Sequence, residues 1–301
     1  MKRGGFGTCV ATGVAVLAFA APAGAGITQY GDLGLVYEQT TTNFSPPPSR
    51  GEQSSYDPCD VGDATGLPLL AGGGWVYDSD PMVTPFEPGQ AYLAGIKFRS
   101  QLPPKTPESW HEIIDNVSTN DSLGLGELTV CGDVNNVSYV MQKAFIPRKD
   151  SGSVKASCPS GKNVLGGGGL VKGPLGKPRL VGSVPVDDAD GNDAPDDGWR
   201  AIGYNGSKKE RKVFAYAICA PIDDLNYLSG AAGGFQPRLG AAIFCTPGEH
   251  AIGGGFRVRG DLAKARVIES RTEPPGDLWR VTADTLSSDE LNIDVHLICH
   301  A

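Results

Sequence analysis

One acidic loop has residue types that could bind a metal ion. Residues 187–197 read Asp-Asp-Ala-Asp-Gly-Asn-Asp-Ala-Pro-Asp-Asp, and Asp188, Asp190 and Asn192 have the alternate spacing of the oxygen ligands in calcium loops. The match is incomplete, because the glycine stands fourth instead of sixth and Trp199 stands where the pattern places a bidentate glutamate. The loop therefore leaves two hypotheses, a calcium site formed by these three residues and a solvated acidic turn. No other cofactor is predicted.

Three glycine runs, at 72–74, 166–168 and 253–255, are candidates for phosphate binding. The sequence lacks the GxxxxGK[ST] pattern, and no helix is expected after any run to direct its amides at an anion. Glycine inside a strand more often marks a bulge or a close approach of two backbones. We therefore expect the runs to serve packing.

The four histidines are His111, His250, His296 and His300. The last two are four residues apart, about 13 Å along a strand, which is too far for a shared metal ion. The sequence contains neither GxSxG nor HExxH, so no catalytic residues are assigned. A glycan-acting enzyme with a pair of carboxylates stays an alternative. The fold brings the two carboxylates of such an enzyme together, so their spacing in the sequence does not reveal them.

Tryptophan faces can stack on pyranose rings, so the four tryptophans are candidate carbohydrate contacts. Trp110, Trp199 and Trp279 recur at equivalent positions, and Trp279 falls on the inner row of an alternating segment. This periodicity predicts that the three form a core layer near a common axis. Trp75 follows a glycine run and has no counterpart in the other units, so it is the candidate for a carbohydrate contact.

These features belong to a unit that occurs three times. Its landmarks are a cysteine, a glycine run, a serine, a tryptophan and a closing cysteine, and the tryptophan precedes the closing cysteine by 21, 20 and 20 residues. Such periodicity determines the architecture, so we expect repeats at 26–136, 137–222 and 223–301. The serine and tryptophan landmarks are Ser100 and Trp110, Ser183 and Trp199, and Ser270 and Trp279.

Six of the seven cysteines open and close the repeats. One disulfide per repeat would join Cys59 to Cys131, Cys158 to Cys219 and Cys245 to Cys299. The alternative is a zinc site, but no CxxC pair is present. We therefore expect disulfides and an oxidising compartment.

Residues 1–25 have the composition of a secretory signal peptide, with Lys2 and Arg3 before an apolar segment and small residues before the cut. The segment is shorter than the roughly 20 residues of a membrane-spanning helix. After its removal, 24 basic residues remain against 34 acidic ones, a net charge of −10. This charge disfavours nucleic acid as a partner. We expect a secreted, extracellular protein without a membrane span, and the sequence does not determine its oligomeric state.

The pattern of apolar residues predicts an all-β fold. Residues 291–299 alternate between apolar and polar side chains, whereas no segment keeps a helical period over three turns. Each repeat is expected to contain four or five strands. A repeat of this size buries little apolar surface alone, which favours a shared core in a three-fold β-prism. A β-trefoil and three tandem small β domains are the alternatives.

Two resemblances follow from these landmarks. Secreted bacterial proteins with β repeats contain Cys-Pro-x-Gly, Gly-Gly-Gly, Gly-Trp and Tyr-Ala-x-Cys, and this chain resembles them at 158–161, 166–168, 198–199 and 216–219. The segments 291–293 and 297–299 are similar to the repeat ends of vitelline membrane outer layer protein, which implies a three-fold β-prism. Neither resemblance implies catalytic residues.

Three functions are consistent with these observations. The first is a non-catalytic structural or adhesive role at the cell surface or in the extracellular space. The second is a lectin-type carbohydrate-binding protein, and the third is a glycan-acting enzyme. The expected partner is a surface glycan or a component of the extracellular matrix.

Overall fold

The structure is a computed structural model, which describes residues 30–43, 49–56, 59, 67–78, 91–99, 109–118, 123–187 and 194–301. The expected signal peptide at 1–25 lies outside these residues, as do Asp188, Asp190 and Asn192. Across the described segments, no helix is long and apolar enough to cross a membrane.

The fold is all-β, as predicted, and the described residues contain eighteen strands, six in each repeat. The first repeat contains β1 (Val36–Asn43), β2 (Ser49–Tyr56), β3 (Leu69–Asp78), β4 (Ala91–Arg99), β5 (Ser109–Asn116) and β6 (Leu123–Cys131). The second contains β7 (Ser138–Ile146), β8 (Asp150–Ser157), β9 (Asn163–Val171), β10 (Pro178–Val186), β11 (Gly198–Asn205) and β12 (Arg211–Ala220). The third contains β13 (Asn226–Gly234), β14 (Arg238–Phe244), β15 (His250–Arg259), β16 (Ala265–Thr272), β17 (Leu278–Thr285) and β18 (Leu291–His300).

The number of strands exceeds the expected four or five, because two strands precede the opening cysteine. In the second repeat, β7 and β8 are connected by the short segment 147–149 and lie at the edges of different sheets. Most side chains of β8 are exposed or half-buried. An edge strand of this kind lacks the apolar row by which a strand is recognised in a sequence.

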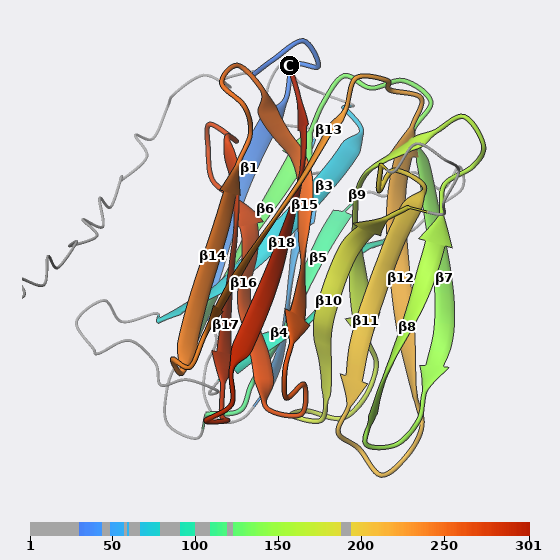
Figure 1. Ribbon diagram of the computed structural model, residues 1–301. Helices are drawn as coiled ribbons and strands as arrows, with labels where there is room; N and C mark the ends of the chain where they lie inside the picture. The colour runs from blue at the N-terminus through green and yellow to red at the C-terminus, as the bar shows by residue number, and fades with distance from the viewer. Residues whose placement is uncertain are drawn as a thin grey trace, which may run out of the picture.

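The strands form three antiparallel sheets of six strands (Figure 1). Sheet I has the order β1-β6-β3-β16-β17-β14, sheet II the order β13-β18-β15-β10-β11-β8, and sheet III the order β2-β5-β4-β9-β12-β7. Each sheet therefore joins three strands of one repeat to three strands of another. This sharing of open sheets among the repeats distinguishes the fold from a β-trefoil and from three tandem domains.

The two halves of each sheet meet along a short junction. In sheet II only Gly182 with Arg257 and Ser183 with Phe256 pair across it, and in sheet III only Gly95 pairs with Leu170. Sheet I also has two pairs at its junction, between β3 and β16. The half-sheets are thus joined near their middle and are free to diverge on either side.

Glycines allow the central strands to approach one another closely, as predicted. A Cβ atom on Gly166 would lie 2.5 Å from the carbonyl oxygen of Leu70, and one on Gly253 would lie 2.2 Å from that of Leu165. Each glycine run follows a β-bulge, at Leu70, Leu165 and Ile252. These three bulge residues are fully buried in one apolar cluster, which marks the common axis of the repeats.

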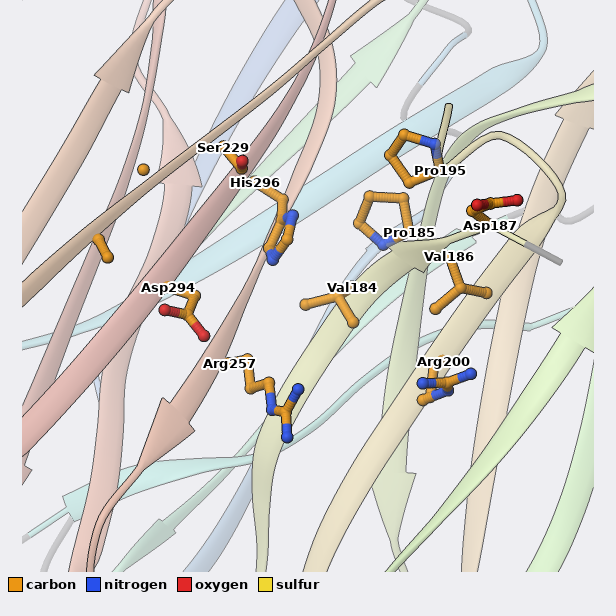
Figure 2. A pocket seen from close by; sticks show the side chains of 12 residues that line it. Val184, Pro185, Val186, Asp187, Pro195, Arg200, Ser229, Arg257, Asp294 and His296 are labelled. Atoms are coloured by element: carbon orange, nitrogen blue, oxygen red, sulfur yellow. The ribbon is translucent and has the colours of Figure 1, made fainter. Parts of the chain in front are cut away.

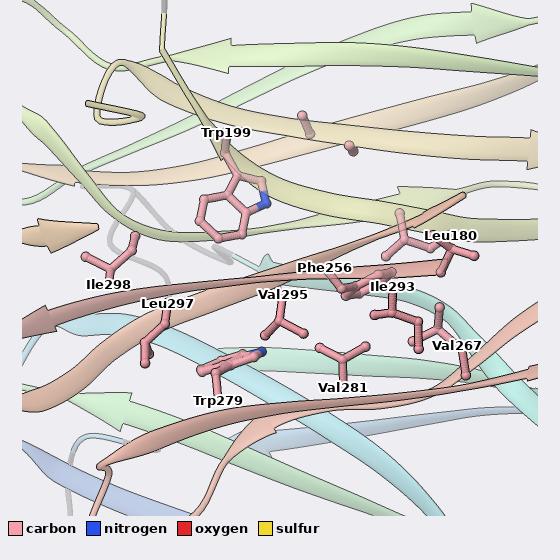
Figure 3. Packing of buried hydrophobic residues seen from close by; sticks show 14 of the residues in the cluster. Leu180, Trp199, Phe256, Val267, Trp279, Val281, Ile293, Val295, Leu297 and Ile298 are labelled. Atoms are coloured by element: carbon pink, nitrogen blue, oxygen red, sulfur yellow. The ribbon is translucent and has the colours of Figure 1, made fainter. Parts of the chain in front are cut away.

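The three repeated tryptophans are core residues, as predicted, with 0–1% of their surface exposed. Each indole packs against the glycine run of its own repeat, Trp110 on Gly72, Trp199 on Gly167 and Trp279 on Gly254. Figure 3 shows Trp279 beside Val281 and Val295, with Trp199 on another strand of the same core cluster. The residues that meet at the axis are the bulge residues Leu70, Leu165 and Ile252 instead of the expected layer of tryptophans, since each indole packs against a glycine that lies two positions after its bulge.

Three disulfides link residues within repeats, Cys59 to Cys131, Cys158 to Cys219 and Cys245 to Cys299. This is the pairing expected from the repeat. Each bridge connects the residues before the glycine-run strand to the last strand of the same repeat, so every repeat is covalently closed. Such bridges are typical of an oxidising environment.

Candidate functional site

A groove with a volume of about 580 Å³ lies on the outer face of sheet II (Figure 2). Strands β10 and β11 of the second repeat form one side, and β13, β15 and β18 of the third repeat form the other. Because these half-sheets pair over only two positions, the surface between them is hollow. The side chains that give the groove its chemistry are Val184, Arg200, Ser229, Arg257, Asp294 and His296.

The alternation of β18 explains which of its residues line the groove. Leu291, Ile293, Val295 and Leu297 are buried on the inner face, so the intervening residues point outward. Asp294 pairs with Arg257 of β15, and both side chains lie on the outer face (Figure 2). The same pairing rule places Arg200 opposite Val184 on the other wall.

The charged groups of the groove differ in whether they already have a hydrogen-bond or ion-pair partner. Asp294 accepts a 2.6 Å hydrogen bond from Arg259 through Oδ1. Burial lowers the pKa of His296, an effect that the neighbouring Asp294 opposes and Arg257 reinforces. Its imidazole is therefore neutral at physiological pH, with one nitrogen to donate and one to accept. Within the described residues, Arg200 and Arg257 make neither a hydrogen bond nor an ion pair, so both guanidiniums are available to a ligand.

The equivalent faces of the other two sheets are filled by side chains. On sheet I, Trp75 holds the position of Arg257, its ring covers Gly126, and the guanidinium of Arg271 lies 4.2 Å from the ring centroid. On sheet III, Leu170 holds that position and packs with Phe214 and Tyr216. Among the side chains that the structure describes, those of sheet II surround an open groove with polar groups.

The site residues expected from the sequence are not in this groove. Trp75 is half-buried beneath Arg271 on sheet I, so a sugar ring would have to displace the guanidinium to stack on it. Its role in carbohydrate binding stays a prediction. So does calcium binding by Asp188, Asp190 and Asn192, although the adjacent Asp187 lines the groove. Among the described residues no cluster of three or more His, Cys, Asp or Glu side chains could hold a metal ion.

No sequence pattern assigned a binding role to Arg200, Arg257 or Asp294, and His296 was considered only as a metal ligand together with His300. The alternation of residues 291–299 contained a signal for Asp294 and His296, since it places them on one outward row. The arginines carried no such signal, because they come from different repeats and reach the same groove only through the pairing of β10 with β11 on one side and β15 on the other.

Two carboxylic acids lie inside the first repeat. Glu112 and Glu127 are both 0% exposed, and the indole nitrogen of Trp110 donates a 2.9 Å hydrogen bond to Glu112 Oε1. Burial raises the pKa of Glu112 well above its usual value, and the nearby Glu127 raises it further. A polysaccharide cannot reach carboxyl groups in this position, so the pair does not form a glycosidase site.

Comparisons with known proteins identify no family. No protein-family model matches the chain, and no curated protein matches it. Among solved structures, a match is found to a protein described in the words "The Triple Jelly Roll Fold and Turret Assembly in an Archaeal Virus". That match has 11% sequence identity and a TM-score of 0.18, and it covers 94% of this chain and 97% of the other. A TM-score this low carries no argument about fold or function.

Proposed function

We propose that this is an exported, non-catalytic adhesive protein of the extracellular space, and that the groove on sheet II binds an anionic surface glycan. The observation that carries the proposal is the pair of uncommitted guanidiniums, Arg200 and Arg257, on opposite walls of an open groove. Arginine recognises carboxylate and sulfate groups through two parallel hydrogen bonds. A glycan with uronate or sulfate groups offers such partners at intervals along its chain. The net charge of −10 and the nearby Asp187 and Asp294 oppose the approach of an anion, so the proposal rests on direct contacts with the two guanidiniums and not on the overall charge of the protein.

The other polar groups of the groove suit the neutral part of a saccharide. His296 can both donate and accept a hydrogen bond, and Ser229 stands beside it on the paired strand β13. Gly230 and Ala231 leave that part of the wall flat, which gives a sugar ring room to approach. The groove thus offers charge recognition by Arg200 on β11 and Arg257 on β15, and hydrogen bonding to hydroxyl groups on the neighbouring strands β18 and β13.

Export is supported by two independent features. The three disulfides suit an oxidising compartment, and residues 1–25 have the composition of a signal peptide. Covalent closure of each repeat also suits a protein that must stay folded outside the cell.

A glycan array tests the proposed ligand class. We expect the protein to bind uronate-containing or sulfated glycans, and we expect Arg257→Ala and Arg200→Ala each to weaken binding about tenfold or more, the effect of losing 1.4 kcal/mol. The matched control is Arg280→Ala, because Arg280 follows the tryptophan of the third repeat as Arg200 follows that of the second. Binding of neutral glycans alone, or an equal loss in the Arg280 variant, would refute the proposal.

A further inference from the structure

Three equivalent residues of the repeats converge on the axis, apart from the groove. Tyr92, Arg179 and Arg266 are the second residues of β4, β10 and β16, and each stands immediately before the residue that precedes a β-bulge. The guanidinium carbon of Arg266 lies 4.9 Å from the ring centroid of Tyr92, and that of Arg179 lies 5.9 Å from it. Contact between symmetry-equivalent side chains places all three on the common axis.

The two arginines are buried and incompletely bonded. Each is 8% exposed, and the Nε atom of each is buried without a hydrogen-bond partner. Arg179 donates through Nη1 to the carbonyl oxygens of Ala263 and Leu262, the latter at 3.5 Å. Arg266 donates through Nη1 to the carbonyl oxygen of Ala265 at 3.2 Å. A buried donor without a partner carries an unrecovered desolvation cost, so these Nε atoms favour an additional acceptor.

The nearby carboxylates are already committed to other cations. Asp115 accepts hydrogen bonds of 2.6 and 2.8 Å from Arg50, and Asp284 accepts bonds of 2.6 and 3.0 Å from Arg238. At the margin of the cluster, Asp261 accepts the backbone N–H of Ala263 at 3.0 Å.

The phenol of Tyr92 adds no negative charge, because burial raises its pKa. Burial and the neighbouring Arg179 lower the pKa of Arg266 to about 10, so its guanidinium is still charged at neutral pH. Arg179 and Arg266 therefore bring two positive charges to the axis without a direct ion pair to any described residue. Asp284 and Asp115 nevertheless favour the charged form of Arg266, and Asp261 favours that of Arg179.

We propose that Arg179 and Arg266 form an axial binding site for a small oxyanion of the phosphate or sulfate type. Oxygens on one tetrahedral anion can accept from both guanidiniums at once, and the anion brings a negative charge that the carbonyl oxygens of the turn lack. The anion would neutralise the repulsion between the arginines and link the starts of β10 and β16 from two different repeats. It would thus act as a non-covalent clamp where no disulfide connects the repeats. This site is independent of the proposed glycan groove.

The test measures anion-dependent stability in the full-length protein. Calorimetric titration with inorganic phosphate should give a saturable signal for one site that persists when Arg200 and Arg257 are replaced, and phosphate should shift urea unfolding to higher urea concentrations. At a phosphate concentration of a hundred times Kd, the unfolding equilibrium constant should fall about 100-fold relative to chloride at equal ionic strength. The double variant Arg179→Met/Arg266→Met should lose this shift. The control variant Arg200→Met/Arg257→Met removes two arginines from the groove and should keep it.

Two results would overturn the axial site. One is the absence of a saturable phosphate signal in the unaltered protein, and the other is an equal phosphate shift in the Arg179→Met/Arg266→Met variant. If that variant does not fold, Arg266→Lys replaces it, since lysine keeps the charge and loses the planar fork. The Arg266→Lys variant should bind phosphate about tenfold more weakly, and unchanged affinity would contradict the proposal. If the unaltered protein binds no glycan but is still stabilised by phosphate, the proposed glycan site is refuted and the axial site is not.

Discussion

The indole N–H of Trp199 donates a 2.8 Å hydrogen bond to the hydroxyl of Ser183, and both side chains are buried. The third repeat contains the same pair, since Trp279 donates to Ser270 at 3.1 Å. In the first repeat Glu112 is the acceptor instead. The serine landmark of the second and third repeats therefore satisfies the single polar atom of a core tryptophan.

The first prediction is that Ser183→Ala destabilises the protein. The substitution leaves a buried indole N–H without an acceptor, which costs about 1–3 kcal/mol of unfolding free energy. Urea unfolding of Ser183→Ala, of Trp199→Phe and of the variant with both substitutions would measure the coupling energy between the two side chains. If the losses of unfolding free energy in the two single variants simply add in the double variant, the hydrogen bond does not explain why the serine recurs.

The repeated landmarks made much of the architecture predictable. The tryptophans, the glycine runs and the cysteines each perform one task that is the same in every repeat, so their recurrence indicated core, close packing and covalent closure. Trp199 illustrates this, because its spacing from Cys219 matches that of Trp279 from Cys299. A recurrent residue type reports a recurrent physical constraint.

The features that differ between repeats could not be predicted in the same way. The axis brings together Tyr92, Arg179 and Arg266, which are equivalent in register, although the first repeat has a tyrosine where the other two have an arginine. The groove likewise depends on the pairing of Arg257 with Gly182, two residues of different repeats. Such sites arise from long-range strand pairing, for which a single sequence contains no local signal.

The second prediction concerns Gly167. A Cβ atom there would lie 2.3 Å from the carbonyl oxygen of Tyr216 and 2.4 Å from the indole of Trp199. Gly167→Ala should therefore destabilise the protein by more than the 1–3 kcal/mol typical of overpacking, because backbone and a buried ring block the methyl group. Thermal unfolding would measure the effect. Gly240→Ala is the control, since its nearest neighbour is 3.7 Å away; equal effects in both variants would contradict this account.

The third prediction concerns covalent closure of the repeats. Replacing Cys245 and Cys299 with serine opens a loop with a sequence separation of 54 residues, and the chain-entropy relation gives a loss of about 4 kcal/mol. Urea unfolding would measure the loss, and peptide mapping without reduction would check the pairing. In this variant the bridges Cys59–Cys131 and Cys158–Cys219 should persist. Bridges between different repeats would contradict the repeat as the unit of closure.

The fourth prediction is that Glu112→Gln stabilises the protein near neutral pH. Ala201 and Val281 hold the equivalent positions after the other tryptophans, so Glu112 is an acid in an apolar position. Burial raises its pKa, which means that the folded state keeps a proton that the unfolded state releases above about pH 4.3. The favourable contribution of this protonation is complete below that pH and is lost as the pH rises through the folded-state pKa.

The sign of the effect makes the experiment specific. Between the unfolded and the folded pKa, the stability of the unaltered protein should fall relative to Glu112→Gln by up to about 1.4 kcal/mol per pH unit. Glutamine keeps an oxygen that can accept from the indole of Trp110, so the 2.9 Å hydrogen bond is conserved in kind. Urea unfolding of both proteins from pH 4 to pH 8 would measure the difference. Parallel pH profiles would show that Glu112 ionises in the folded state as it does in the unfolded chain, because only a raised pKa makes the two profiles diverge.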